Sequence, residues 1–117
     1  MNDQLIFETT QEYTKLLEAG KLALALPLIR QAAHWADVDS QILAERIYLH
    51  EAYGHPIDYR SGFEYALLAA MNGDLQSMHD LGMIYKKGYG AAPDLEKAKY
   101  WLEKAERLGF KDQKFDA

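Results

Sequence analysis

Apolar side chains recur along the chain at intervals of three and four residues, the period of a helix with one buried face. In residues 77–85, for example, Met78, Leu81 and Tyr85 fall on one helical face. The alternation of apolar and polar residues that indicates a β-strand does not compete with this period. The pattern therefore predicts six helices, over residues 4–19, 21–35, 40–52, 59–71, 75–87 and 95–108.

Residues that start and end helices support these boundaries. Aspartates that can accept a backbone N–H group in the first turn precede four of the predicted helices: Asp37 or Asp39, Asp58, Asp74 and Asp94. Gly73 and Gly109 follow two of them, where a glycine can adopt the left-handed conformation that closes a helix. Pro27 lies inside the second segment, so we expect that helix to start near Leu24 or to bend.

The sequence also repeats itself at an offset of 36 residues, since residues 94–105 align with residues 58–69. An aspartate, a small residue, an aromatic residue, an alanine and a glycine recur in turn: Asp58 and Asp94, Gly62 and Ala98, Tyr65 and Trp101, Ala69 and Ala105, Gly73 and Gly109. Ala33 lies 36 residues before Ala69, so residues 20–33 form an earlier, diverged copy.

The copies predict one domain of three antiparallel helix pairs stacked on one another. The approximate repeats are residues 4–36, 37–73 and 74–109, followed by a short tail, residues 110–117. Phe115 in this tail could pack back on the domain. Gly82 costs a helix about 1 kcal/mol relative to alanine, so we expect a neighbouring helix to approach it closely. The aromatic side chains at repeat positions are expected in the core: Tyr65, Tyr85 and Trp101.

The last repeat carries the densest pattern. Its pattern residues are Leu81, Gly82, Tyr85, Gly88, Gly90, Asp94, Lys97, Ala98, Trp101, Lys104, Ala105 and Gly109. With these residues, segment 74–109 resembles the Sel-like repeat, a subclass of the tetratricopeptide superfamily. The middle repeat resembles it less closely. There Leu43-Ala44 occupies the position of the leucine–glycine pair, and either Ile47 or Tyr48 occupies the position of the tyrosine.

The resemblance implies an all-α, right-handed superhelix of helix pairs that serves as a scaffold or adaptor for other proteins, often in bacteria. Stacked pairs leave an extended concave face, which suits the binding of a protein or a peptide. In this superfamily the first helix of each pair lines that face. The binding residues predicted in this way are Gln41, Glu45, Tyr48 and Leu49 in the middle repeat and Gln76, His79, Met83 and Lys86 in the last.

Charge narrows the class of partner. The net charge is −5, and residues 1–73 carry all of it, with five Lys and Arg against ten Asp and Glu. This excess argues against nucleic acid, which needs a basic surface, and favours a basic protein. The alternative is a solvated surface without a role. Some small bacterial members of the family are similar to immunity proteins, so neutralisation of a toxin is a second hypothesis, and a homodimer is a further one.

Composition excludes several other classes. The chain has 117 residues, 49% of them hydrophobic and 26% charged, which is typical of one soluble globular domain. It has no cysteine, so disulfides and thiolate metal sites are excluded. Its first residues lack the basic and apolar regions of a signal peptide, and no apolar run is long enough for a membrane span. We therefore expect a cytoplasmic protein without a membrane partner.

Candidate catalytic and metal-binding groups form no recognisable motif. His50 and His55 are five residues apart, whereas a helical zinc site has histidines four residues apart beside a carboxylate. Glu45 and Glu51 could form a carboxylate pair, but nothing in the sequence places a nucleophile beside them. We therefore predict no metal, no cofactor and no catalytic residue. An enzyme would instead need perturbed ionisable groups clustered in one cleft.

Overall fold

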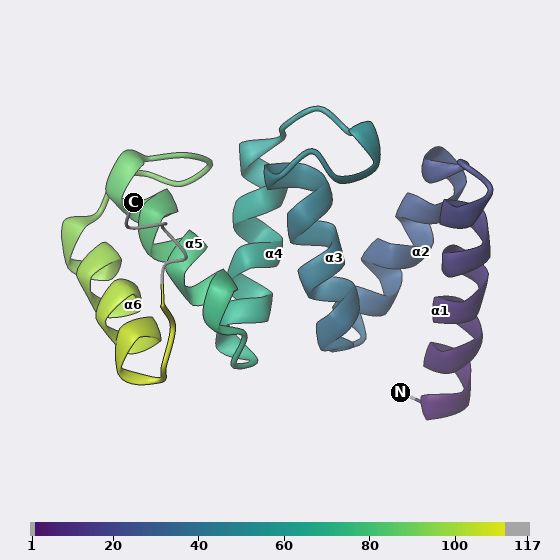
Figure 1. Cartoon of the computed structure of the whole chain (residues 1–117), viewed down its shortest axis with the longest axis horizontal. Coiled ribbons are helices and arrows are strands. Elements are labelled where there is room, and N and C mark those ends of the chain that lie inside the picture. Colours follow the sequence, from purple (N-terminus) through teal and green to yellow (C-terminus); the bar gives the residue numbers. More distant parts are fainter. Residues whose placement is uncertain (1, 112–117) are drawn as a thin grey trace, which may run out of the picture.

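The computed structural model describes residues 2–111, which fold into a row of α-helices (Figure 1). The helices are α1 (Asp3–Glu18), α2 (Leu22–His34), α3 (Val38–Leu49), α4 (Tyr59–Met71), α5 (Leu75–Lys87) and α6 (Leu95–Arg107), with a 3-10 turn, η1 (Ala52–Gly54), between α3 and α4. No strand occurs within residues 2–111. The predicted all-α class is therefore confirmed, with six α-helices in the described part of the chain.

The end of α3 differs from the prediction. The helix stops at Leu49, although the hydrophobic pattern extends it to residue 52. Glu51 and Tyr53 have φ values of 55° and 56°, left-handed conformations that an α-helix cannot include. The chain therefore leaves α3 through a tight irregular turn, and this turn sets the position of His50.

Four aspartate caps fix the starts of the later helices, as predicted. Each side chain accepts the backbone N–H of the third residue after it: Asp37 from Ser40 (3.1 Å), Asp58 from Ser61 (3.1 Å), Asp74 from Ser77 (2.9 Å) and Asp94 from Lys97 (3.1 Å). A cap of this kind stabilises a helix by about 1 kcal/mol. In contrast, α2 has no side-chain cap and begins at Leu22 rather than near Leu24, with Pro27 in its interior.

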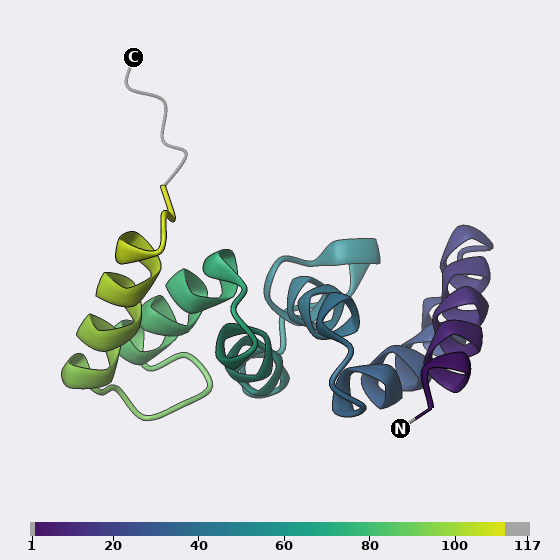
Figure 2. The ribbon, with the colours of Figure 1, turned by 90° about the horizontal axis from the view of Figure 1, so that it is seen from below.

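Each helix packs mainly on the helices before and after it, so the chain forms a stack with α1 and α6 at its two ends (Figures 1 and 2). Glycine permits close approach within the pairs. A Cβ atom at Gly82 of α5 would lie 2.6 Å from Cγ of Leu102 in α6, and one at Gly62 of α4 would collide with Leu49 of α3. The close approach predicted at Gly82 is confirmed.

Two hydrophobic clusters fill the stack. The first lies among α1 to α4 and contains Tyr13, Ala25, Ile29, Ala32, Ala33, Ala44, Ile47, Tyr48 and Tyr65. The second lies among α4 to α6 and contains Ala70, Met78, Leu81, Tyr85, Ala98 and Ala105. Tyr65 and Tyr85 are buried as predicted, whereas Trp101 is only half-buried at the edge of the second cluster. Within the described residues no further helix follows α6 to cover this side chain.

The chain leaves α6 through Gly109, whose φ of 107° closes the helix. Phe110 then packs against His79 of α5, with ring centroids 4.5 Å apart. Phe115 lies outside the described residues, so its predicted packing stays a prediction. None of the described helices combines the length and the apolar character needed to cross a membrane.

Candidate functional site: a groove and an ionisable cluster between α3 and α5

Three of the eight predicted binding residues, Gln41, Glu45 and Tyr48, are buried in α3. The Gln41 side chain donates a hydrogen bond of 2.9 Å to the backbone carbonyl of Ala33. The Tyr48 ring stacks on Tyr65, with centroids 5.7 Å apart. The expectation that these three side chains line an open face is therefore wrong.

The cause is the register between the first helices of the two repeats. The caps Asp37 and Asp74 are 37 residues apart. The buried positions follow that same offset: Ser40, Gln41, Ala44, Glu45, Ile47 and Tyr48 in α3, and Ser77, Met78, Leu81, Gly82, Ile84 and Tyr85 in α5. Aligning Leu43 with Leu81 places α3 one residue out of register, and one residue turns a helix face by about 100°. The repeated Asp-x-x-Ser cap was the signal that fixes the register.

Leu49 and Met83, two other predicted binding residues, are half-buried and come together in one shallow groove. This α3–α5 groove has a volume of about 160 Å³ and is lined by Leu49, His50, Tyr59, Asp80, Met83, Ile84, Lys87 and Tyr89. Gln76 and Lys86 are exposed on α5 but do not line the groove. His79 lies apart from it, in a hollow beside Phe110.

An aromatic pair forms one rim of the groove. Tyr59 and Tyr89 stack with ring centroids 4.7 Å apart, and each is 43% exposed. Gly90 makes this contact possible, because its φ is 84° and a Cβ atom there would collide with the backbone of Tyr59. The turn between α5 and α6 is thus held against the start of α4, which fixes the position of the rim.

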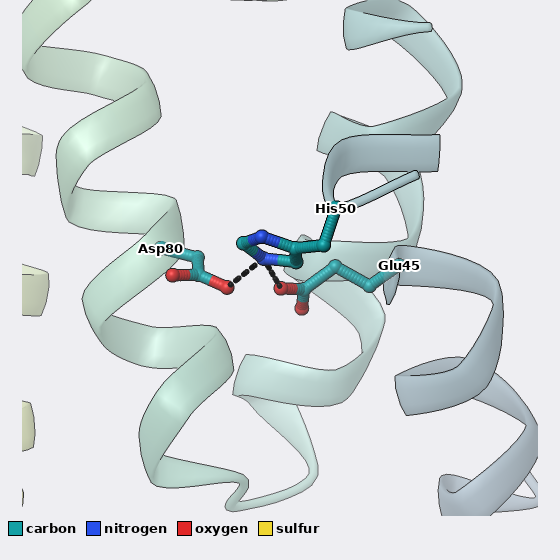
Figure 3. Close-up of side chains that lie close together, drawn as sticks. All are labelled: Glu45, His50 and Asp80. Atoms are coloured by element: carbon teal, nitrogen blue, oxygen red, sulfur yellow. Dashed lines mark hydrogen bonds and ion pairs between the residues drawn. The ribbon is translucent and has the colours of Figure 1, made fainter. Parts of the chain in front are cut away.

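An ionisable cluster lies beside the groove, where α3 faces α5 (Figure 3). Glu45 belongs to α3, His50 is the residue that ends α3, and Asp80 belongs to α5. His50 Nε2 lies 3.2 Å from Asp80 Oδ2 and 3.9 Å from Glu45 Oε2. Gln76 donates a hydrogen bond of 3.0 Å to the other oxygen of Asp80. Sequence reasoning missed this cluster because Asp80 lies 30 residues after His50 and only the stacking of repeats joins them.

The three groups perturb one another's protonation. Burial raises the pKa of Glu45 to about 7, against the lowering effect of His50. The Glu45 carboxylate and then Asp80 raise the pKa of His50 to about 9, although partial burial opposes them. Burial alone would raise the pKa of Asp80, but hydrogen bonds with Glu45, Gln76 and His50 outweigh it and hold that pKa below its ordinary value. At neutral pH, His50 is therefore a cation between two acidic groups.

Clustered groups with perturbed pKa values are the feature expected of an enzyme, yet the cluster lacks a nucleophile. The Ser77 hydroxyl, which reaches toward Glu45, donates a 2.7 Å hydrogen bond to the Asp74 cap. The cluster does offer donors to a metal ion, because one ligand atom from each residue lies within 4.8 Å of the other two. The prediction of no metal considered only the spacing of the histidines along the chain, and this arrangement across two repeats lay outside it.

Comparisons with known proteins agree with this architecture. The chain is 33% identical over 85 residues to the mouse protein "DAP3-binding cell death enhancer 1" and 32% identical to its rat counterpart. The matched segment covers 73% of this chain but spans only 16% of the length of either relative. The crystal structure of a Sel1 repeat protein from Oxalobacter formigenes matches with a TM-score of 0.66 at 23% identity, over 91% of this chain and 90% of that one.

The model of the Sel1 repeat matches residues 42–74 and 75–110, which together make up more than half of the chain. The first match covers most of α3 and all of α4, and the second covers α5 and α6. Sel1 repeat proteins are generally protein-interaction modules built on a non-enzymatic scaffold fold. The chain belongs to the Sel1 repeat family.

Proposed function

We propose that this chain is a non-catalytic interaction module that binds a partner protein at the α3–α5 groove and its aromatic rim. The observation that carries the proposal is the convergence of Leu49 and Met83 with the stacked Tyr59–Tyr89 pair at one accessible place. Aromatic and methionine side chains are enriched in protein interfaces, and tyrosine is among the residues that contribute most to binding energy there. The family and the name of the mouse relative, which describes a protein-binding protein, support this class of ligand.

Exposed apolar side chains also lie on the segment that joins α3 to α4. Tyr53 is 58% exposed and Ile57 is 42% exposed there, next in sequence to the rim residue Tyr59. Single exposed apolar residues are normal, but several in one connected region mark an interaction site. We therefore extend the proposed surface from the groove onto residues 53–59.

Charge suggests the character of the partner. The acidic excess of residues 1–73 would attract a basic protein and speed its association at low salt. Neutralisation of a toxin would use the same surface, and its distinguishing feature would be a partner that loses its own activity in the complex. An adaptor would leave that activity intact.

The test compares two matched double variants. Met83→Lys with Tyr89→Ala changes the groove and its rim, whereas Met71→Lys with Tyr100→Ala makes the same changes elsewhere, at residues that are 69% and 54% exposed. Each protein is immobilised and challenged with native extract, and the retained proteins are measured by quantitative mass spectrometry. Affinity for the purified partner is then measured.

We expect the wild type and the Met71/Tyr100 variant to retain the same partner, and the groove variant to bind it at least about tenfold more weakly. Circular dichroism spectra should be the same for all three proteins. A partner that binds the groove variant as tightly as the wild type would refute the proposed surface. Equal loss in both variants would refute it as well.

A further inference from the structure

The ionisable cluster has the spacing of a metal site. His50 Nε2 lies 3.2 Å from Asp80 Oδ2 and 3.9 Å from Glu45 Oε2, and all three ligand atoms lie within 4.8 Å of one another. Bonds of about 2.0–2.1 Å at tetrahedral angles separate two ligand atoms by roughly 3.3 Å. Small rotations of the two carboxylate side chains therefore bring all three donors to coordination distance of one ion.

Glu45 supplies a second observation that points to a ligand. Its side chain is only 3% exposed, yet Oε1 has no hydrogen-bond partner among the residues that the structure describes. An unpaired oxygen of a buried carboxyl group is costly. A proton on His50 does not remove this cost, because His50 faces Oε2. A cation held between the three side chains would bind Oε2, and bidentate coordination by the Glu45 carboxylate would engage Oε1 as well.

The site is open on one side and firmly held on the other. The His50 side chain is 52% exposed and that of Asp80 is 14% exposed, so an ion can enter from the α3–α5 groove and keep water ligands. Gln76 orients Asp80 through its 3.0 Å hydrogen bond, and the backbone N–H of His50 bonds to the Arg46 carbonyl at 2.9 Å. Ligands oriented by such neighbours bind metal more tightly.

We propose that Glu45, His50 and Asp80 bind a divalent transition-metal ion of the zinc type, which joins α3 of one repeat to α5 of the next. One imidazole and two carboxylates suit Zn²⁺, with water in the open position. Mg²⁺ prefers oxygen ligands and a nearly complete octahedron, so it binds this donor set more weakly. Two carboxylates and a neutral imidazole also balance the charge of a divalent ion. This inference does not rest on the proposed partner binding.

The test uses the whole chain without an affinity tag, titrated calorimetrically with zinc chloride and, separately, with magnesium chloride. Variants Glu45→Gln, His50→Gln and Asp80→Asn each remove one ligand. His34→Gln is the matched control, because His34 faces a single carboxylate, Glu64, at 3.3 Å on an exposed surface. Repeating the titration in buffers with different ionisation enthalpies measures the protons released, since a metal ion must displace the proton of a coordinating histidine.

We expect one Zn²⁺ per chain, with release of between about one and two protons per ion near neutral pH, one from His50 and a fraction of one from Glu45. Each ligand variant should bind at least about tenfold more weakly, the His34→Gln variant should bind as the wild type does, and Mg²⁺ should bind much more weakly. Circular dichroism shows whether the variants are folded. If one of the three ligand variants is not folded, the other two test the proposal. No saturable Zn²⁺ binding by the wild type, or binding that all folded ligand variants retain, would overturn the proposal. An equal loss in the His34→Gln variant would do so too.

Discussion

Replacing Glu45 by glutamine should change how stability depends on pH, because the amide has the shape of the protonated carboxyl group and cannot ionise. Burial raises the pKa of Glu45 from its ordinary 4.5 to about 7. The folded state therefore holds this proton more tightly than the unfolded state does, and the protein loses stability as pH rises from about 4.5 through about 7.

The neighbouring groups define the rest of the profile. The pKa of His50 is raised from 6.5 to about 9, so its stabilising contribution is complete below pH 6.5 and is lost as pH rises through 9. The pKa of Asp80 is lowered from 3.8, so its contribution is present above that value and is lost in acid. Together the three groups make the protein most stable in mildly acidic solution and less stable toward pH 9.

The magnitude follows from the displaced pKa of Glu45. A displacement from 4.5 to about 7 corresponds to at most about 3 kcal/mol. Water reaches the cluster past the half-exposed His50 side chain, so we expect a smaller effect of about 1–2 kcal/mol. The Glu45→Gln variant should match the wild type at about pH 4, below the pKa of the unfolded carboxyl group, and exceed it by that amount at about pH 9, or by about 4–8 °C in melting temperature.

Urea denaturation followed by circular dichroism, with a chelator present to exclude metal ions, measures the free energy of unfolding at each pH. Glu64→Gln is the control, because Glu64 is an exposed carboxylate that also faces a histidine. Its profile should follow that of the wild type. A Glu45→Gln variant whose stability stays parallel to the wild type from acid to alkaline pH would show that Glu45 does not titrate as a buried group.

Three further predictions concern the scaffold and its charge. Gly90→Ala should lower the free energy of unfolding by about 2–4 kcal/mol, because φ is 84° and the new Cβ atom meets the Tyr59 backbone. Gly73→Ala should lower the free energy of unfolding by only about 1 kcal/mol, because its φ is 97° but no atom lies within 4 Å of the new Cβ atom. Equal losses of stability in the two variants, measured by urea denaturation, would contradict this difference. Asp74→Ala should cost about 1–2 kcal/mol in the same assay, because it removes the cap from Ser77, and an unchanged midpoint would refute a role for the cap. Partner affinity should fall several-fold between low and physiological salt, mainly through slower association in surface plasmon resonance, and salt-independent association would argue against a basic partner.

The sequence predicted the helices because their signals are local. Asp58, Asp74 and Asp94 cap the helices that they were expected to cap. Leu102 of α6 packs closely against Gly82, as predicted from the presence of a glycine inside a helix. The burial of Glu45 and Tyr48 depends on which face of α3 turns inward, and a one-residue error of register reverses that assignment.

The ionisable cluster was harder still to predict from the sequence. His50 stands where α3 ends, and that end depends on left-handed backbone conformations at Glu51 and Tyr53, two residues that rarely adopt them. Asp80 meets His50 only because α4, which packs on both α3 and α5, brings these two helices near each other. No local pattern links the two residues, so the cluster is a product of the packing of one repeat on the next.

Photo-crosslinking tests the central claim, that the α3–α5 groove binds a partner protein, most directly. A benzophenone side chain is placed at position 83 in the groove or at position 71 on the exposed end of α4, and each protein is irradiated with the captured partner. We expect a crosslink to the partner from position 83 and none from position 71. A crosslink from position 71 with none from position 83 would contradict it.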